Sequence, residues 1–141
     1  MTGIFNQYLL VFNGALIGFM IFFVIVVSPA VFKSLSQDEA ARFLRTIFPR
    51  LFLVGLFTSF VIVLLSLASG ERDLVLISTA IAAGFAVNYS ILTPNINKTR
   101  DAILAGNIQK EKQFKLLHLL SVSVFFAQIC ASILIVVTNI K

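Results

Sequence analysis

Charge and chemically reactive side chains are scarce in this sequence. Its 141 residues include no tryptophan, one cysteine and one histidine, and only 12% of them are charged. The single cysteine, Cys130, cannot form a disulfide within the chain, which excludes quinone-linked disulfide formation because that reaction needs a redox pair. One histidine cannot supply the four axial ligands of a diheme helical bundle.

The six carboxylates all lie in loops or at the ends of apolar runs. They are Asp38, Glu39, Glu71, Asp73, Asp101 and Glu111. Their positions argue against a small proton-driven exporter, which needs a carboxylate inside the membrane. They also argue against a di-iron bundle, which needs several carboxylates in its core. The sequence also lacks a Walker loop, a Gly-x-Ser-x-Gly element and a metal-spaced cluster of histidine and cysteine. These absences favour a protein that is not an enzyme.

Apolar residues, in contrast, make up 59% of the chain, and the mean hydropathy is +1.01. A soluble domain of this size buries only about two-thirds of its chain's surface and could not hide so much apolar area. Four apolar runs are long enough to cross a hydrocarbon core of about 30 Å as helices. They span residues 8–32, 51–69, 74–93 and 114–138. The sequence predicts an all-α membrane protein, a single transmembrane domain over residues 1–141 that forms an antiparallel four-helix bundle.

The first and third connections between these runs carry helix signals of their own. Ser36 followed three residues later by Glu39 is the capping-box pattern that begins a helix. We expect a short helix along the membrane interface between spans one and two, joined to span two at Pro49. Pro94 is expected to kink or restart the third helix, which then extends beyond the bilayer.

Basic residues are concentrated in the same two connections. Nine of the 11 lie there, and the other two are Arg72 and Lys141. The nine are Lys33, Arg42, Arg45, Arg50, Lys98, Arg100, Lys110, Lys112 and Lys115. The positive-inside rule places both connections in the cytoplasm and both termini outside it, in a multi-pass protein of the cell inner membrane. Because this rule accounts for the net charge of +5, we expect no nucleic-acid partner.

Small residues recur at helical spacing inside the spans. Gly14-x-x-x-Gly18 occurs in span one, and Ser78, Ala82, Ala86 and Ser90 follow one another at four-residue intervals in span three. Helices in lipid pack closely where such residues meet, which favours a tight bundle. The partner predicted by composition is the lipid bilayer. A homo-oligomer built on the same small residues and a place in a larger membrane complex stay open as alternatives.

A few polar residues fall inside the spans. His118, Ser121 and Gln128 share one face of span four, and Asn88 of span three and Ser28 of span one could meet that face. Polar groups in hydrocarbon bond to one another, so interhelical hydrogen bonding is the simplest interpretation. The alternative is a polar cavity open to the cytoplasm, with His118 as ligand or proton carrier. No cofactor is predicted, although heme or a metal bound through His118 is a variant of that alternative.

Several short elements resemble a known family. They are Ser28-Pro29-Ala30-Val31-Phe32, the segment Ala40–Pro49 with its Phe-Pro step, Asn88-x-x-x-Leu92-x-Pro94, and Leu117-His118-x-x-Ser121. Together they resemble the membrane family called domain of unknown function 4149, whose best-known relatives are transmembrane protein 205-like. The resemblance implies a four-helix membrane protein without an established activity, and eukaryotic relatives are associated with resistance to a platinum drug. The shared positions it implies are Pro29, Phe32, Asn88, Pro94, Arg100, His118 and Ser121.

The leading hypothesis for function is therefore a non-enzymatic membrane protein that handles a small solute or metal, or that is an accessory component. One alternative is a heme- or metal-binding redox protein that uses His118. The other is a structural subunit of a larger membrane complex.

Overall fold

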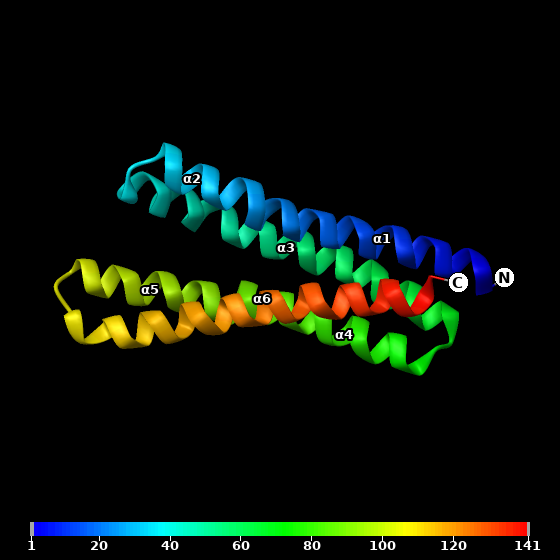
Figure 1. The fold of residues 1–141 in the computed structure, drawn as a ribbon. Coiled ribbons are helices and arrows are strands. Elements are labelled where there is room, and N and C mark those ends of the chain that lie inside the picture. The colour runs from blue at the N-terminus through cyan, green and yellow to red at the C-terminus, as the bar shows by residue number, and fades with distance from the viewer. Residues whose placement is uncertain (1, 141) are drawn as a thin grey trace.

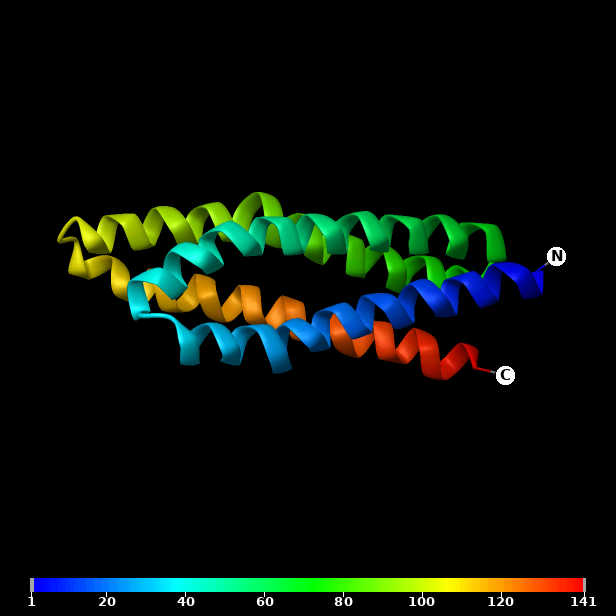
Figure 2. The ribbon, with the colours of Figure 1, turned by 90° about the horizontal axis from the view of Figure 1, so that it is seen from above.

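Four antiparallel helical segments, of 32 or 33 residues each, run side by side along the length of the molecule (Figures 1 and 2). The computed structural model describes residues 2–140, and no strand occurs among them. All four segments are long and apolar enough to cross a membrane, which confirms the predicted helical, membrane-spanning bundle. In chain order the elements are α1 (Thr2–Phe22), the π-helix η1 (Phe23–Val27), α2 (Ser28–Ser34), α3 (Gln37–Ser69), α4 (Arg72–Val87), the π-helix η2 (Asn88–Leu92), α5 (Thr93–Leu104), the 3-10 helix η3 (Ile108–Lys110) and α6 (Glu111–Asn139).

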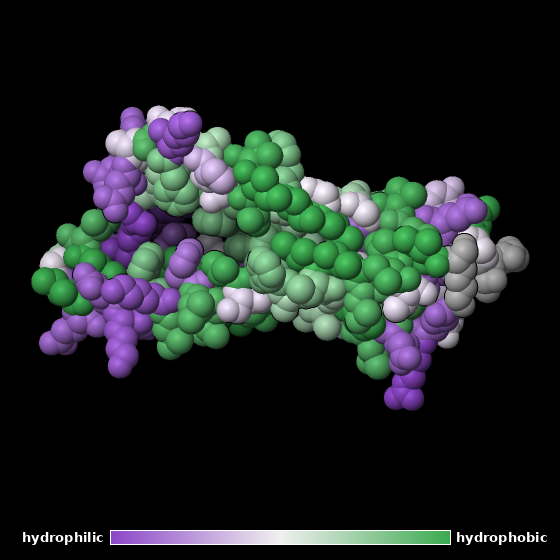
Figure 3. Space-filling view, viewed as in Figure 1, coloured by the Kyte–Doolittle hydropathy of each residue, from purple (hydrophilic) through white to green (hydrophobic). Residues whose placement is uncertain are grey.

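The two ends of the bundle differ in charge. The N and C labels lie together at one end in Figure 1, which we call the terminal end. The α2–α3 and α5–α6 connections lie at the opposite end, where many hydrophilic residues are visible in Figure 3. These two connections and the helix ends beside them carry the nine basic residues named above, so we call this the basic end.

The helix that begins at Ser36 does not stop at Pro49. The predicted capping box is present, because the backbone N–H of Glu39 donates to Ser36 Oγ at 3.4 Å and the N–H of Ser36 donates to Glu39 Oε2 at 3.0 Å. The prediction of a separate interfacial helix is wrong, because α3 runs unbroken from Gln37 to Ser69 with Pro49 inside it. Proline removes one ladder hydrogen bond, and a helix in a membrane protein tolerates that loss. Leu44 and Phe48 pack against the core instead of facing the membrane surface.

The other two prolines each follow a π-helical turn. Pro29 lies two residues after the end of η1, and Pro94 lies two residues after the end of η2. A π turn holds one extra residue, and such a bulge is a common way for a helix to accommodate a proline or a kink. At the proline expected to kink or restart the third helix, Pro94, the segment passes through the π turn η2 and continues directly as α5.

Close packing is concentrated in the terminal half. There α1 packs against both α3 and α6, and α4 also packs against both, which closes a ring of four helices. Ser66 and Ser78 are fully buried, and their hydroxyls bond to each other at 2.8 Å across α3 and α4. Gly14 and Gly18 do not form the predicted close packing within this chain. Both lie on the exposed face of α1, and a Cβ atom added at either position would have no neighbour within 4 Å.

Candidate functional site

Toward the basic end the four segments separate into two pairs (Figure 1). The first arm, residues 28–49, is α2 with the first part of α3, and the second arm, residues 93–122, is α5 with the first part of α6. Within each arm the two helices pack on one another. Among the described residues α2 contacts neither α5 nor α6, and α3 meets α5 over a short stretch only. The ring of helices that is closed in the terminal half is therefore open here.

A cavity of about 880 Å³ lies between the arms. It is the hollow with a polar interior at the basic end in Figure 3. All four segments contribute to its lining, and its volume falls within the range of small-molecule binding sites. We call it the arm cavity.

Aromatic rings form the floor of the arm cavity, where it meets the packed half. Phe23 of η1 and Phe48 of α3 lie 5.5 Å apart between ring centroids, Phe48 and Phe52 lie 5.9 Å apart, and Phe52 and Phe125 of α6 lie 6.1 Å apart. These four rings line the cavity. Phe85 of α4 stands edge-on to Phe125 at 6.4 Å and is fully buried. This chain of rings links all four segments and presents an apolar surface to any occupant.

Guanidinium groups line the outer part of the cavity, which we call its rim. Arg42 and Arg45 come from the first arm and Arg100 from the second. Asp38 is the one carboxylate residue in the lining among the described residues. In the part of the chain that the structure describes, neither Arg42 nor Arg100 has a carboxylate within 4.0 Å. The rim therefore carries an excess of positive charge, which favours an anionic group.

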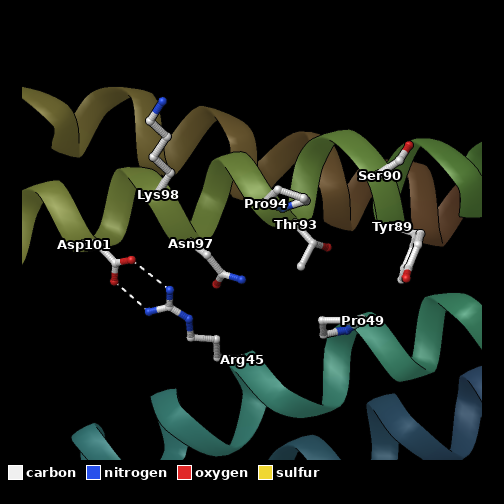
Figure 4. Close-up of a pocket in the computed structure, with 9 residues that line it drawn as sticks. All are labelled: Arg45, Pro49, Tyr89, Ser90, Thr93, Pro94, Asn97, Lys98 and Asp101. Carbon is white, nitrogen blue, oxygen red and sulfur yellow. Dashed lines mark hydrogen bonds and ion pairs between the residues drawn. The ribbon is translucent and has the colours of Figure 1, made fainter.

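The third rim arginine, Arg45, joins the two arms. Its guanidinium donates two hydrogen bonds to the carboxylate of Asp101 on α5, at 2.6 and 2.8 Å (Figure 4). Both side chains are about half exposed and lie beyond the apolar runs. The hydrogen bonds from Arg45 lower the pKa of Asp101, which keeps that carboxyl ionised.

Both members of this ion pair also line a second, shallower cavity of about 620 Å³ (Figure 4). Pro49, Tyr89 and Pro94 are among its lining residues. Arg45, Thr93 and Asn97 line both cavities. Arg45 therefore borders both cavities, whereas Asp101 lines only the second.

Three residues of the predicted polar face reach the arm cavity. Ser28, His118 and Ser121 all line it. His118 is exposed and stacks parallel to Phe114, with the ring centroids 6.2 Å apart. Asn88 is fully buried behind Ser121. The Ser121 hydroxyl donates to Asn88 Oδ1 at 2.6 Å, and Asn88 Nδ2 donates to the Ser121 carbonyl at 3.4 Å.

Gln128 does not join this group. It is nearly fully buried deeper along α6, packs against Gly84 and donates to the backbone carbonyl of Ile81 at 2.8 Å. It is absent from the cavity lining, because it lies two helical turns beyond Ser121. Its amide instead joins α6 to α4 within the packed half.

The positions implied by the family resemblance are divided among several places. Phe32 and Arg100 line the arm cavity, and Pro94 lines the second cavity. Pro29 is exposed at the start of α2. Within residues 2–140, no three side chains of histidine, cysteine, aspartate or glutamate come close enough together to hold a metal ion.

Sequence reasoning missed Arg42, Arg45 and the phenylalanine floor. The arginines were used only to predict the membrane orientation, because a single sequence does not show which face of residues 37–49 points into the bundle. One signal was available: Leu44 and Phe48 are spaced one turn apart, and so are Asp38 and Arg42. An inward-facing helix and an interfacial helix share this pattern.

One comparison with known proteins gives a match. The family model described as domain of unknown function (DUF4149) matches residues 11–105. This range covers the first three helical segments and ends before α6, so it contains Pro29, Phe32, Asn88, Pro94 and Arg100 and leaves His118 and Ser121 outside. No curated protein and no solved structure matches the chain.

Proposed function

Because the chain belongs to the DUF4149 family, whose description names no activity, we propose its function from the arm cavity. The protein is a non-enzymatic integral membrane protein that binds a small solute between its two arms. The cavity itself is the observation that carries this proposal. A bundle with only a structural task has no need of about 880 Å³ of space beneath a polar rim.

The polar groups in the cavity suit binding better than reaction. The hydroxyl hydrogen of Ser121 is directed to Asn88, so toward the cavity Ser121 Oγ offers an acceptor. His118 stacks on Phe114, and no hydrogen bond between a base and a nucleophile is formed among the described residues that line the cavity. Asn88 acts as a positioning residue, since it fixes the Ser121 side chain without reaching the cavity.

The bias of basic residues supports an orientation for this cavity. With nine basic residues at one end, the positive-inside rule places the basic end in the cytoplasm. In this orientation the protein spans the cell inner membrane, the arm cavity opens to the cytoplasm, and both termini lie on the opposite side of the membrane. Heme or metal binding through His118 and membership of a larger complex stay predictions.

Cysteine labelling tests whether the cavity is open to water. In a Cys130→Ser background, Ser28→Cys and Ala41→Cys each place one thiol in the cavity lining, on opposite helices of the first arm. We expect a charged, membrane-impermeant thiol reagent to modify both from the side of the basic end in sealed vesicles. Mass spectrometry of the intact protein measures the modification.

Two controls sharpen this experiment. Ile133→Cys places a thiol on the exposed apolar surface of α6 outside the cavity, and we expect no modification there. Adding Ala41→Trp to the Ser28→Cys variant fills the cavity and is expected to slow labelling. Complete protection of both cavity cysteines would overturn the proposed function.

A further inference from the structure

We propose that the occupant of the arm cavity is a lipid with an anionic headgroup, which enters sideways from the bilayer between α2 and α6. The inference rests on the proposed function and names the class of solute that the same cavity takes. Three features of the described residues carry it: an apolar opening at the side, a positive rim at the level of the membrane surface, and an aromatic floor.

The side opening lies where the two arms do not meet. Val24 and Phe32 border it from the first segment, and Val122 and Phe126 border it from α6. All four line the cavity and are exposed, Phe32 by 64% and Phe126 by 60%. Phe32 lies near the tip of the first arm, since α2 ends at Ser34. Val24, Val122 and Phe126 lie well inside the apolar runs 8–32 and 114–138, so the opening between them faces hydrocarbon. An acyl chain can pass it without leaving an apolar environment.

The positive rim lies closer to the arm tips than Val24, Val122 and Phe126 do. Arg42 and Arg100 belong to the helical extensions beyond the apolar runs 51–69 and 74–93, at the level expected for lipid headgroups. Arg100 is half-buried and Arg42 is exposed, and both line the cavity. Asp38 lies in the first turn of α3, where the helix N-terminus stabilises its charge, so it does not need either arginine as a partner.

The polarity of the cavity lining changes in one direction, from charged at the rim to apolar at the floor. From rim to floor the lining changes from guanidinium groups to phenylalanine rings, in the same order as a lipid changes from headgroup to chain. A small water-soluble anion would use the rim and leave the aromatic floor exposed to water. A neutral apolar solute would make no use of the guanidinium groups of Arg42 and Arg100, which donate no hydrogen bond to their neighbouring carboxylates because Glu39 bonds to Ser36 and Asp101 to Arg45. An anionic lipid would place its headgroup at the arginines of the rim and its acyl chains against the aromatic floor.

Native mass spectrometry of the full chain tests the proposal. The purified protein is equilibrated in mild non-ionic detergent with equal amounts of phosphatidylglycerol and phosphatidylcholine of the same chain length. We expect phosphatidylglycerol to be retained preferentially. Because each guanidinium–phosphate contact is charge-assisted, the Arg42→Gln/Arg100→Gln variant should retain about tenfold less of it.

A matched control removes the same charge from the same two helices. Arg50 of α3 and Lys98 of α5 do not line the arm cavity, and the Arg50→Gln/Lys98→Gln variant should retain phosphatidylglycerol as the unaltered protein does. An equal loss in this control would show general attraction to a basic surface and would overturn the proposal. Equal retention of phosphatidylcholine would overturn it as well.

Two further measurements separate the bilayer from water as the source of the ligand. Val122→Trp narrows the side opening without changing any charge, and it should reduce phosphatidylglycerol retention. Unchanged retention in this variant, or equally tight binding of glycerol 3-phosphate or inorganic phosphate, would overturn access from the bilayer. If the cavity cysteines react with the thiol reagent but the protein retains no anionic lipid, this inference alone is overturned. If the cavity cysteines do not react, the proposed function is overturned as well.

Discussion

The two halves of the bundle use the same four helical segments and pack them differently. In the terminal half each helix has two neighbours, and small polar side chains such as Ser59, Ser66, Ser78 and Ser132 are fully buried between them. In the basic half the pairs diverge around the arm cavity, and Arg45 with Asp101 supplies an ion pair across the gap. The comparison shows that length and hydropathy place helices in a membrane but do not decide which of their surfaces meet.

The reason lies in what drives contact between helices in lipid. Acyl chains are as apolar as leucine, so close packing depends on small residues and on interhelical hydrogen bonds. The terminal half has both, as the bond between Ser66 and Ser78 illustrates. In the basic half, arginines and bulky phenylalanines occupy the facing positions, and the helices stay apart.

The largest effect is expected where a side chain is added at the closest approach in the packed half. A Cβ atom at Gly55 would overlap the ring of Phe85, which is fully buried. Because a phenylalanine ring cannot bend away and has no free space beside it, Gly55→Ala should destabilise the protein by about 1–3 kcal/mol. Unfolding in mixed micelles titrated with dodecyl sulfate measures this change.

Gly18→Ala is the matched control for that substitution. Gly18 is exposed on α1, and an added Cβ meets nothing within 4 Å. Since alanine is the better helix former by up to about 1 kcal/mol, this variant should be as stable as the unaltered protein or more so. If Gly18→Ala costs as much as Gly55→Ala, Gly18 lies at a contact that this chain does not make with itself, and the exposed face of α1 is an interface.

A smaller effect is expected at the boundary between the halves, where Asn88 and Ser121 bond to each other. In a double-mutant cycle of Asn88→Ala and Ser121→Ala, the coupling should be about 0.6–1.7 kcal/mol, the range found for interhelical hydrogen bonds in membranes. Asn95→Ala is the control, because Asn95 is exposed and its amide bonds only to the Ile91 carbonyl of its own segment. A coupling of zero would mean that the pair is not formed in the membrane.

Much of the fold followed from the sequence because the signals were local. The four long apolar runs and the capping box at Ser36 depend only on neighbouring residues. The continuation of α3 through Pro49 did not follow. It depends on Leu44 and Phe48 packing against other helices, which is a long-range property.

The candidate site was accessible from the sequence only in part. Helical spacing placed His118 and Ser121 on one face of α6, and similar depth suggested that Asn88 would meet them. Spacing alone could not show that Gln128 lies beneath the aromatic floor or that Arg42 and Arg100 share a cavity with Ser28. The divergence of the arms decides these points, and it depends on which residues face one another across helices.

The smallest effect is expected at the ion pair between the arms, because Arg45 and Asp101 are about half exposed to solvent. The folded-state pKa of Asp101 is lowered by its hydrogen bonds to Arg45. The pair therefore contributes above the ordinary aspartate pKa of about 3.9 and is lost as the pH falls through the lowered value. Spin labels at Ser34 and Gln109, at the exposed tips of the two arms, should show a constant distance near neutral pH and a broader distribution on acidification below about pH 4.

Asp101→Asn separates this ion pair from the other carboxylates that titrate in the same range. The variant should show the broader distance distribution at neutral pH, and acid should then change it little. Asp73→Asn, which removes an exposed carboxylate at the terminal end, should behave as the unaltered protein does. If the arms keep one distance in all three proteins at every pH, the phenylalanine floor alone holds them, and the Arg45–Asp101 contact has no part in setting the width of the cavity.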